Sequence, residues 1–174
     1  MKKRKVFTAI AATAAAMLTA AAVALCIVFP NKYSQTLDAA ADEFGVDRAL
    51  VRSVVWAESK FEKDATSRSG ACGLMQLMPD TYKQCATALG IEGGADGIYS
   101  VENSLRCGCY YLSLLLEKYE DATAALMAYN AGEANADKFL AGEKVFGETE
   151  RYIENVALAK SVYGFVGKFS RKSG

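Results

Sequence analysis

Apolar residues along most of the chain recur every three or four positions, which is the spacing that lets a helix bury one face. No strand-like alternation of any length and no internal repeat interrupts this pattern. After residue 30 the pattern predicts helices at 34–44, 48–59, 79–89, 100–119, 121–129 and 149–163. Several short helices at such spacing predict a compact all-α domain.

Capping and turn residues mark the ends of these predicted helices. A Ser, Thr or Asp can accept hydrogen bonds from the free N–H groups of a first helical turn, and glycine after the last turn favours termination. Residues of the first kind are Ser34, Asp47, Ser100, Asp121 and Thr149, and Gly45, Gly90 and Gly132 are of the second. The Gly-rich stretch at 90–99 is predicted to be a loop.

The first thirty residues differ from the rest of the chain. Residues 2–5 are all Lys or Arg, and no charged residue occurs from Val6 to Pro30. This run has about the ~20 residues that a transmembrane helix needs, and the basic cluster before it should stay in the cytoplasm. We therefore expect residues 1–30 to be a basic tip and a single transmembrane helix, and residues 31–174 to be one domain on the extracytoplasmic side.

A cleaved signal peptide is the main alternative, because the small residues at 19–22 offer a cleavage site. The apolar run continues past that site, which favours an uncleaved anchor. A lipoprotein attached through Cys26 is disfavoured because Leu25 is bulky where a small residue is usual. The domain is exported in each case, and it is secreted if the N-terminus is cleaved.

Charge and composition exclude several classes of function. After the basic cluster the chain has 16 basic and 20 acidic residues, and this balance argues against nucleic acid, whose phosphates need clustered Lys and Arg. The chain has no histidine, which excludes Ser-His-Asp triads, Cys-His hydrolases and His-ligated zinc. A hydrolytic or lytic enzyme of this composition must use carboxylates, and we expect no metal and no cofactor.

Four cysteines lie in the exported part: Cys72, Cys85, Cys107 and Cys109. An even number outside the cytoplasm favours disulfides, and four cysteines allow three pairings. Cys107 and Cys109 point in different directions on a helix, so we do not expect them to pair with each other. A four-thiolate zinc site is the alternative, although Cys72 and Cys85 lack the close spacing typical of such sites.

One carboxylate lies on an apolar helix face. Val51, Val54 and Val55 form the apolar stripe of the predicted helix 48–59, and Glu58 follows them at spacings that place it on the same face. Desolvation there would raise the pKa of Glu58, and a carboxylic acid still protonated near neutral pH can act as a general acid. The structural alternative is a glutamate near a helix end that turns to solvent or pairs with an arginine.

Residues suited to sugar binding follow Glu58 in the chain. Ser67 stands among small residues that let the backbone approach a ligand closely, and the amide of Gln76 can both donate and accept hydrogen bonds. Tyr129 and Asn130 sit together at a predicted helix end, where the ring can stack on a sugar and the amide can bind an acetamido group. Each residue alone also has an ordinary structural explanation, and for Met75 this alternative is a place in the core.

Four motifs in a fixed order carry a more specific signal. They are Glu-Ser-Lys-Phe at 58–61, Gly-Leu-Met-Gln-Leu-Met-Pro at 73–79, Ala-Tyr-Asn-Ala-Gly at 128–132 and Glu-Thr-x-x-Tyr at 148–152. Together they resemble the soluble lytic transglycosylase family, which has a goose-type-lysozyme-like fold, over about residues 33–163. The cysteines are not part of that pattern.

The resemblance implies a role for each matching position. Glu58 would act first as the general acid and then as the general base. Side chains lining the glycan cleft would be Ser67, Met75, Gln76, Tyr129 and Asn130, and Glu148 and Tyr152 would support its floor. The implied substrate is a peptidoglycan strand, and the enzyme is expected to be a monomer.

The implied reaction needs only one carboxylate. Glu58 would protonate the oxygen between N-acetylmuramic acid and N-acetylglucosamine, and then deprotonate the C6 hydroxyl, whose attack on C1 leaves a 1,6-anhydromuramic end. Most glycosidases use two carboxylates, so a lysozyme-type muramidase that activates water with Asp64 or Asp80 is the first alternative. The second is a wall-binding protein without catalytic activity. The sequence leaves open whether strands are cut internally or from their ends.

Overall fold

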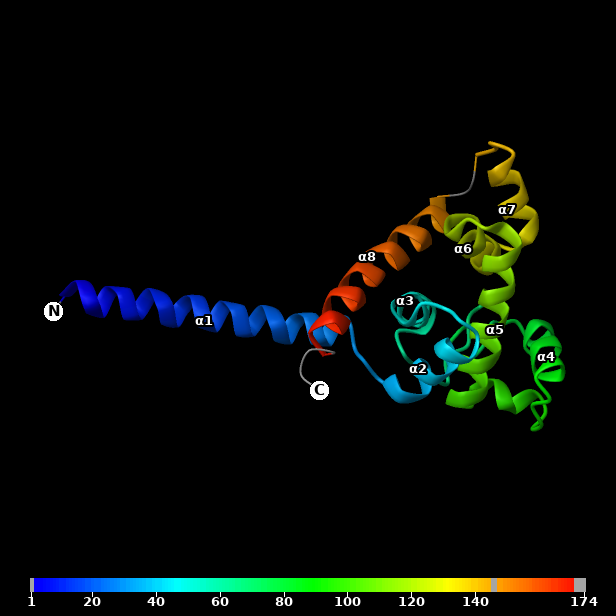
Figure 1. Ribbon diagram of the computed structural model, residues 1–174, viewed down its shortest axis with the longest axis horizontal. Helices are drawn as coiled ribbons and strands as arrows, with labels where there is room; N and C mark the ends of the chain where they lie inside the picture. The colour runs from blue at the N-terminus through cyan, green and yellow to red at the C-terminus, as the bar shows by residue number, and fades with distance from the viewer. Residues whose placement is uncertain (1, 145–146, 171–174) are drawn as a thin grey trace. The chain divides into compact units, whose positions relative to one another are not determined.

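The computed structural model describes residues 2–144 and 147–170 of the chain. It divides into two compact units, Met1–Asn31 and Lys32–Gly174 (Figure 1). Each unit is described by itself below.

The first unit consists of one helix, α1 (Lys2–Val28). Its described side chains are exposed, including Met17, Leu18 and Ile27, whereas the side chains of the basic residues 2–5 lie outside the described ones. None of the helices in the described part of the chain combines the length and the apolar character that crossing a bilayer requires. The predicted transmembrane helix is therefore not confirmed.

The regular secondary structure described in the second unit consists of helices, as predicted. Its elements are α2 (Ser34–Glu43), α3 (Arg48–Ser59), α4 (Pro79–Ala88), the 3-10 helix η1 (Ala95–Tyr99), α5 (Val101–Tyr119), α6 (Ala122–Ala131), α7 (Glu133–Leu140) and α8 (Gly147–Ser170). Extended pairing within the described residues is limited to two isolated bridges around Cys72. The most extensive helix contact joins α3 to α8, and α5 contacts α2, α4 and α6.

Three of the predicted helix starts are confirmed by their hydrogen bonds. The side chain of Asp47 accepts from the N–H of Leu50 at 2.8 Å, and that of Asp121 accepts from the N–H of Ala124 at 2.8 Å. Ser100 caps α5 in the same way. These bonds satisfy N–H groups that the first turn of a helix leaves without a partner.

Other local predictions were wrong or incomplete. Ser34 begins α2 instead of capping it, and the capping position belongs to Tyr33, which makes no capping hydrogen bond with its side chain. The stretch predicted as a loop contains η1. Helix α7 was not predicted, because only Ala136 among its residues is buried and it therefore shows no apolar stripe. Helix α8 runs beyond the predicted end at 163, through two glycines.

The core of this unit forms around α3. The three valines of the predicted stripe, Val51, Val54 and Val55, have no exposed surface. Just after α3, the ring of Phe61 lies edge-on against Tyr163 of α8, with 6.4 Å between ring centroids. Burial of these apolar side chains is the main stabilising contribution, and it fixes the last turn of α3 against α8.

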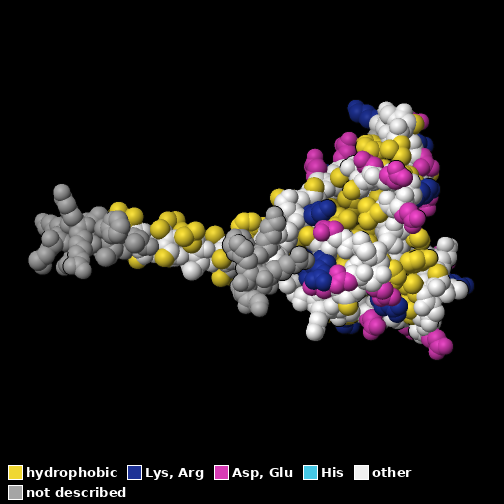
Figure 2. All heavy atoms as spheres, in the orientation of Figure 1, with side chains coloured by type: hydrophobic (Ala, Val, Ile, Leu, Met, Phe, Trp, Pro, Cys, Tyr) yellow, Lys and Arg dark blue, Asp and Glu magenta, His cyan; other side chains and the backbone are white. Residues whose placement is uncertain are grey.

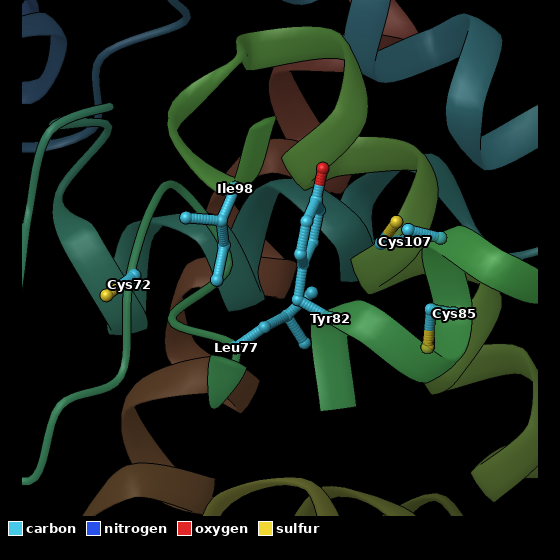
Figure 3. Close-up of a cluster of buried hydrophobic side chains, with 7 residues drawn as sticks. Cys72, Leu77, Tyr82, Cys85, Ile98 and Cys107 are labelled. Atoms are coloured by element: carbon cyan, nitrogen blue, oxygen red, sulfur yellow. The ribbon is translucent and has the colours of Figure 1, made fainter. Parts of the chain in front are cut away.

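The predicted disulfides are absent: Cys72, Cys85, Cys107 and Cys109 are all buried and free. Three of them belong to one hydrophobic cluster, in which Cys85 of α4 and Cys107 of α5 lie at one end and Cys72 at the other (Figure 3). Burial raises the pKa of Cys85 to about 11 and that of Cys107 to about 12. These thiols pack as small apolar side chains, and the described residues hold no group of three or more possible metal ligands.

Candidate active site

Glu58 occupies the last turn of α3, on the face that the buried valines define. Its side chain is largely desolvated, although the residue keeps some accessible surface. This desolvation raises the pKa of Glu58 from its ordinary value of 4.5 to about 7, against the opposing effects of a hydrogen bond with Tyr152 and of the positive charge of Lys60. The equilibrium of this carboxyl at neutral pH is thus shifted toward its protonated form.

Two tyrosines from other helices lie close to this carboxyl. Tyr152 comes from the second turn of α8 and Tyr129 from the end of α6. Burial raises the pKa of both hydroxyls, and the charge of Glu58 raises it further. Both phenols therefore remain neutral near Glu58 over the pH range in which proteins work.

The hydroxyl of Tyr152 has unused hydrogen-bonding capacity. It is buried and has no hydrogen bond of ordinary length and angle to the described residues, while its interaction with Glu58 is strong enough to oppose the rise in the pKa of that carboxyl. The two groups are therefore neighbours whose hydrogen bond is long or poorly aligned. Such geometry is common in catalytic sites without a ligand and tightens when one binds.

Tyr129, in contrast, is held firmly. Its hydroxyl donates a hydrogen bond to the carbonyl of Met75 at 2.8 Å, and its ring lies tilted against Tyr111 of α5, with centroids 5.4 Å apart. The side chain of Met75 has no exposed surface. Met75 therefore lies behind the site, and its backbone carbonyl is the part that touches Tyr129.

Gly108 explains how α5 can lie directly against Met75. A Cβ atom at this glycine would be 2.2 Å from the sulfur of Met75, which no real contact permits. A second glycine, Gly73, has a φ of 77°, and a Cβ there would lie 2.4 Å from the carbonyl oxygen of Ile98. Both glycines of the core are therefore required by close approach, and Gly73 also by its backbone conformation.

The loop between α3 and α4 is tied to α3 by Ser59. The hydroxyl of Ser59 donates to the carbonyl of Leu74 at 2.8 Å. Ser59 belongs to the first of the four motifs, but no role was predicted for it. The signal was available, since a serine directly after the catalytic candidate stands at a helix end, where its hydroxyl can reach the carbonyls of a neighbouring loop.

Ser67 and Gln76 lie in this loop with their polar groups turned onto the loop itself. The hydroxyl of Ser67 accepts from the N–H of Ala71 at 3.0 Å. The side-chain amide of Gln76 donates to the carbonyls of Ala65 at 3.1 Å and Gly73 at 3.0 Å. The carbonyl oxygen of the Gln76 amide makes none of the hydrogen bonds recorded for the described residues, and it remains available to a ligand.

The remaining predicted site residues lie farther out. Asn130 at the end of α6 and Glu148 at the start of α8 are both exposed. The structure therefore brings Glu58, Tyr129 and Tyr152 together from three helices, with the Gln76 loop behind Tyr129. On the face shown in Figure 2, hydrophobic side chains gather between α8 and α6, the helices that supply the two tyrosines.

The two carboxylates considered as partners for Glu58 are not placed for that role. Asp64 is exposed and pairs with its neighbour Lys63 at 2.8 Å, and Asp80 is exposed in the first turn of α4. Neither is among the groups that perturb the pKa of Glu58. The site therefore has one acid/base candidate, and a second carboxylate is missing from its described neighbours.

A family model decides the class to which this arrangement belongs. The Transglycosylase SLT domain matches residues 35–151, which include α3, the loop after it, α6 and the start of α8. The chain belongs to the SLT transglycosylase family. The family predicted from the four motifs is thereby confirmed.

The curated relatives that this SLT protein matches are longer than this chain. The membrane-bound lytic murein transglycosylase C of Haemophilus influenzae strain PittGG is 29% identical over 144 residues, which cover 76% of this chain and 40% of that protein. The transglycosylase of Enterobacteria phage PRD1 is 35% identical over 103 residues, which cover 59% of this chain and 36% of the phage protein. The chain thus spans about two fifths of the length of these relatives.

Solved structures of SLT proteins share the fold of this chain. An inactive Glu-to-Gln mutant of lytic transglycosylase Slt from Pseudomonas aeruginosa superposes with a TM-score of 0.78 at 29% identity, over 83% of this chain and 26% of that one. The 70 kDa soluble lytic transglycosylase of Escherichia coli gives a TM-score of 0.75 at 22% identity, over 82% and 25%, and supports the fold alone. The all-α architecture predicted for the domain is confirmed.

Proposed function

We propose that this SLT domain is a peptidoglycan lytic transglycosylase that cleaves the β-1,4 bond between N-acetylmuramic acid and N-acetylglucosamine. The observation that carries the proposal is a single desolvated carboxyl, Glu58, with a pKa of about 7, next to two neutral tyrosine hydroxyls. Family membership and the names of the relatives support the same chemistry.

In the proposed first step, Glu58 in its acid form donates its proton to the glycosidic oxygen. The bond between that oxygen and C1 of the muramic residue breaks, and the acetamido oxygen of the substrate bonds to C1 in its place. The glycosidic oxygen, now protonated, leaves as the C4 hydroxyl of N-acetylglucosamine. An acid whose pKa lies near the working pH serves this step well, because it holds a proton and releases it easily.

In the proposed second step, Glu58 has become a carboxylate and takes the proton of the C6 hydroxyl. The C6 oxygen bonds to C1, the acetamido oxygen is released, and a 1,6-anhydromuramic end results without consumption of water. An attack from within the substrate has a high effective concentration. This fits a site in which no second carboxylate lies next to Glu58 to activate water.

The binding roles of the other residues are part of the same proposal. We propose that Tyr129, Asn130, Ser67 and the free carbonyl of the Gln76 amide contact the glycan. Tyr152 would donate to the Glu58 carboxylate as it forms, and Met75 would act from behind by fixing Tyr129. Glu148, exposed at the start of α8, would contact the outer part of a bound strand.

The test compares Glu58→Gln with Glu117→Gln, a control at an exposed position on α5. Glutamine keeps the shape of the side chain but has no proton to donate. We expect Glu58→Gln to release no soluble fragments from purified peptidoglycan while still binding it in a sedimentation assay, and Glu117→Gln to behave as wild type. Retained cleavage by Glu58→Gln would refute the assignment of Glu58.

We also propose that the N-terminal segment holds the enzyme at the outer side of the cytoplasmic membrane. The support comes from the sequence, in which a basic cluster precedes an uncharged run, and from the relatives named as membrane-bound. Alkaline extraction of membranes from expressing cells tests it. The full-length chain should stay with the membrane, and its release as a soluble, shortened chain would show cleavage instead.

A further inference from the structure

The second half of α8 has two apolar faces that differ in their exposure. One face belongs to the core, where Val156 and Ala159 have no exposed surface and Tyr163 is 6% exposed. This face holds the helix against the rest of the unit. The other face also consists of apolar side chains, yet the core does not cover it.

The second face forms a continuous stripe. Leu158 is 57% exposed and Val166 is 46% exposed, and Val162 between them is partly exposed. Phe165 leaves 64% of its surface exposed beside the contacts that it makes. With about 3.6 residues per turn, these four positions lie within roughly a third of the helix circumference. We call them the α8 stripe.

The charged residues in the C-terminal part of the chain are all basic. From Asn155 to the C-terminal residue the sequence contains Lys160, Lys168, Arg171 and Lys172 and no acidic residue. The rest of the exported part is acidic on balance, so this end differs from it in charge as well as in apolar exposure. Lys160 forms a long, solvent-exposed ion pair with Asp47, at 3.9 Å, and such exposed pairs contribute little energy.

We propose that the α8 stripe docks on the surface of a lipid bilayer that contains anionic headgroups. A helix with exposed aliphatic and aromatic residues on one side, in a part of the chain whose charged residues are all Lys or Arg, suits the headgroup region of such bilayers. The apolar side chains enter the boundary with the acyl chains, and the basic side chains meet the phosphates. Charge complementarity is the reason to favour this partner over a second copy of the chain, whose exported surface is acidic.

Such docking would orient the enzyme relative to the membrane. The α8 helix carries Tyr152 near its first turns and the α8 stripe near its last. A bilayer contact at the C-terminal end of a rigid helix would hold the other end, with the proposed active site, away from the membrane and toward the wall. This inference stands on the exposed stripe and its charge, and it does not require that Glu58 be catalytic.

Photocrosslinking in the full-length chain tests the docking. A benzophenone amino acid replaces Val166 in one variant and Leu114 in a matched control, because Leu114 on α5 is 42% exposed and is apolar but lies outside the stripe. Each variant is incorporated into vesicles of phosphatidylcholine with or without phosphatidylglycerol and irradiated. Lipid adducts are then quantified by mass spectrometry.

We expect several-fold more lipid adduct at position 166 than at position 114 in vesicles with phosphatidylglycerol. The excess should fall in vesicles of phosphatidylcholine alone and at high salt, because salt screens the basic side chains. Introducing Leu158→Asp into the position-166 variant should also remove it, whereas Leu114→Asp should not. Circular dichroism shows whether each variant keeps its helix content.

Three results would overturn the proposal. Equal adduct yields at the two positions would mean that the stripe does not face lipid. Crosslinks from position 166 to residues 1–31 would show that another segment of the chain covers it. Crosslinks to a second chain would show an interface between copies instead.

Discussion

Replacing Glu58 by glutamine should make the stability of the protein depend on pH in a different way. In the folded protein the pKa of Glu58 is raised to about 7 from an ordinary value of 4.5, chiefly because burial disfavours the charged carboxylate. In the unfolded chain the carboxyl returns to its ordinary value. Between these two pH values the unfolded state has lost the proton and the folded state still keeps it.

This difference in pKa determines both the sign and the magnitude of the change in folding stability with pH. As pH rises through the window from 4.5 to about 7, the wild type loses folding stability, because deprotonation favours the unfolded state. At about 1.4 kcal/mol for each pH unit, the loss sums to about 3 kcal/mol and is complete above pH 7. Glutamine carries no charge at any of these pH values, so the Glu58→Gln variant does not lose this folding stability.

Urea unfolding at several pH values measures the effect. The free energy of unfolding of Glu58→Gln minus that of wild type should rise by about 3 kcal/mol between pH 4 and pH 8. The exposed-site control Glu117→Gln should show a nearly constant difference. If the difference for Glu58→Gln is flat with pH, or falls, the carboxyl is not desolvated and the proposed acid loses its basis.

Three further predictions concern the surroundings of Glu58 and the core. Tyr152→Phe removes the hydroxyl that opposes the rise in the pKa of Glu58, so the alkaline limb of the pH–activity profile should move to higher pH; an unchanged profile would exclude the contact. Gly108→Ala places a Cβ 2.2 Å from the sulfur of Met75 and should lower the free energy of unfolding by about 1–3 kcal/mol in thermal or urea unfolding. Gly164→Ala, with nothing within 4 Å of its Cβ, should leave it unchanged or raise it, and equal losses in both variants would contradict the packing. All five cysteines are free, so a thiol titration of unfolded chain without reductant should find five thiols per chain, and a lower count would restore the disulfides.

Much of α3 and its glutamate could be predicted because the signals are local. The Asp47 cap, the valine stripe and the position of Glu58 all lie within twelve consecutive residues. Helical spacing alone then places the carboxyl on the buried face. The structure adds the quantity that matters, a pKa near 7.

The assembly of the site could not be predicted from spacing, because it joins residues distant in sequence. Tyr152 reaches Glu58 only through the packing of α8 on α3, whereas the resemblance implied only that Tyr152 supports the floor of the cleft. The same limit applies to Met75. An apolar residue in a binding motif can line a cleft or lie beneath it, and only the close approach of Gly108 shows that its side chain is in the core.

The disulfide prediction failed for a related reason. Counting cysteines in an exported chain gives a tendency, while a bond needs two Cβ atoms within about 4.5 Å and suitably oriented. Here the four thiols of the domain are buried among apolar side chains without forming such a bond. Helix α7 escaped prediction because a short surface helix with one buried residue leaves no periodic signal.

In the proposed reaction one glutamate performs both proton transfers and water takes no part. Digestion of purified peptidoglycan by the full-length chain in water enriched in oxygen-18, followed by mass spectrometry of the fragments, tests it directly. We expect muramic ends that are lighter by one water than reducing ends and that lack the heavy isotope. Reducing ends that carry oxygen-18 would show hydrolysis and would contradict it.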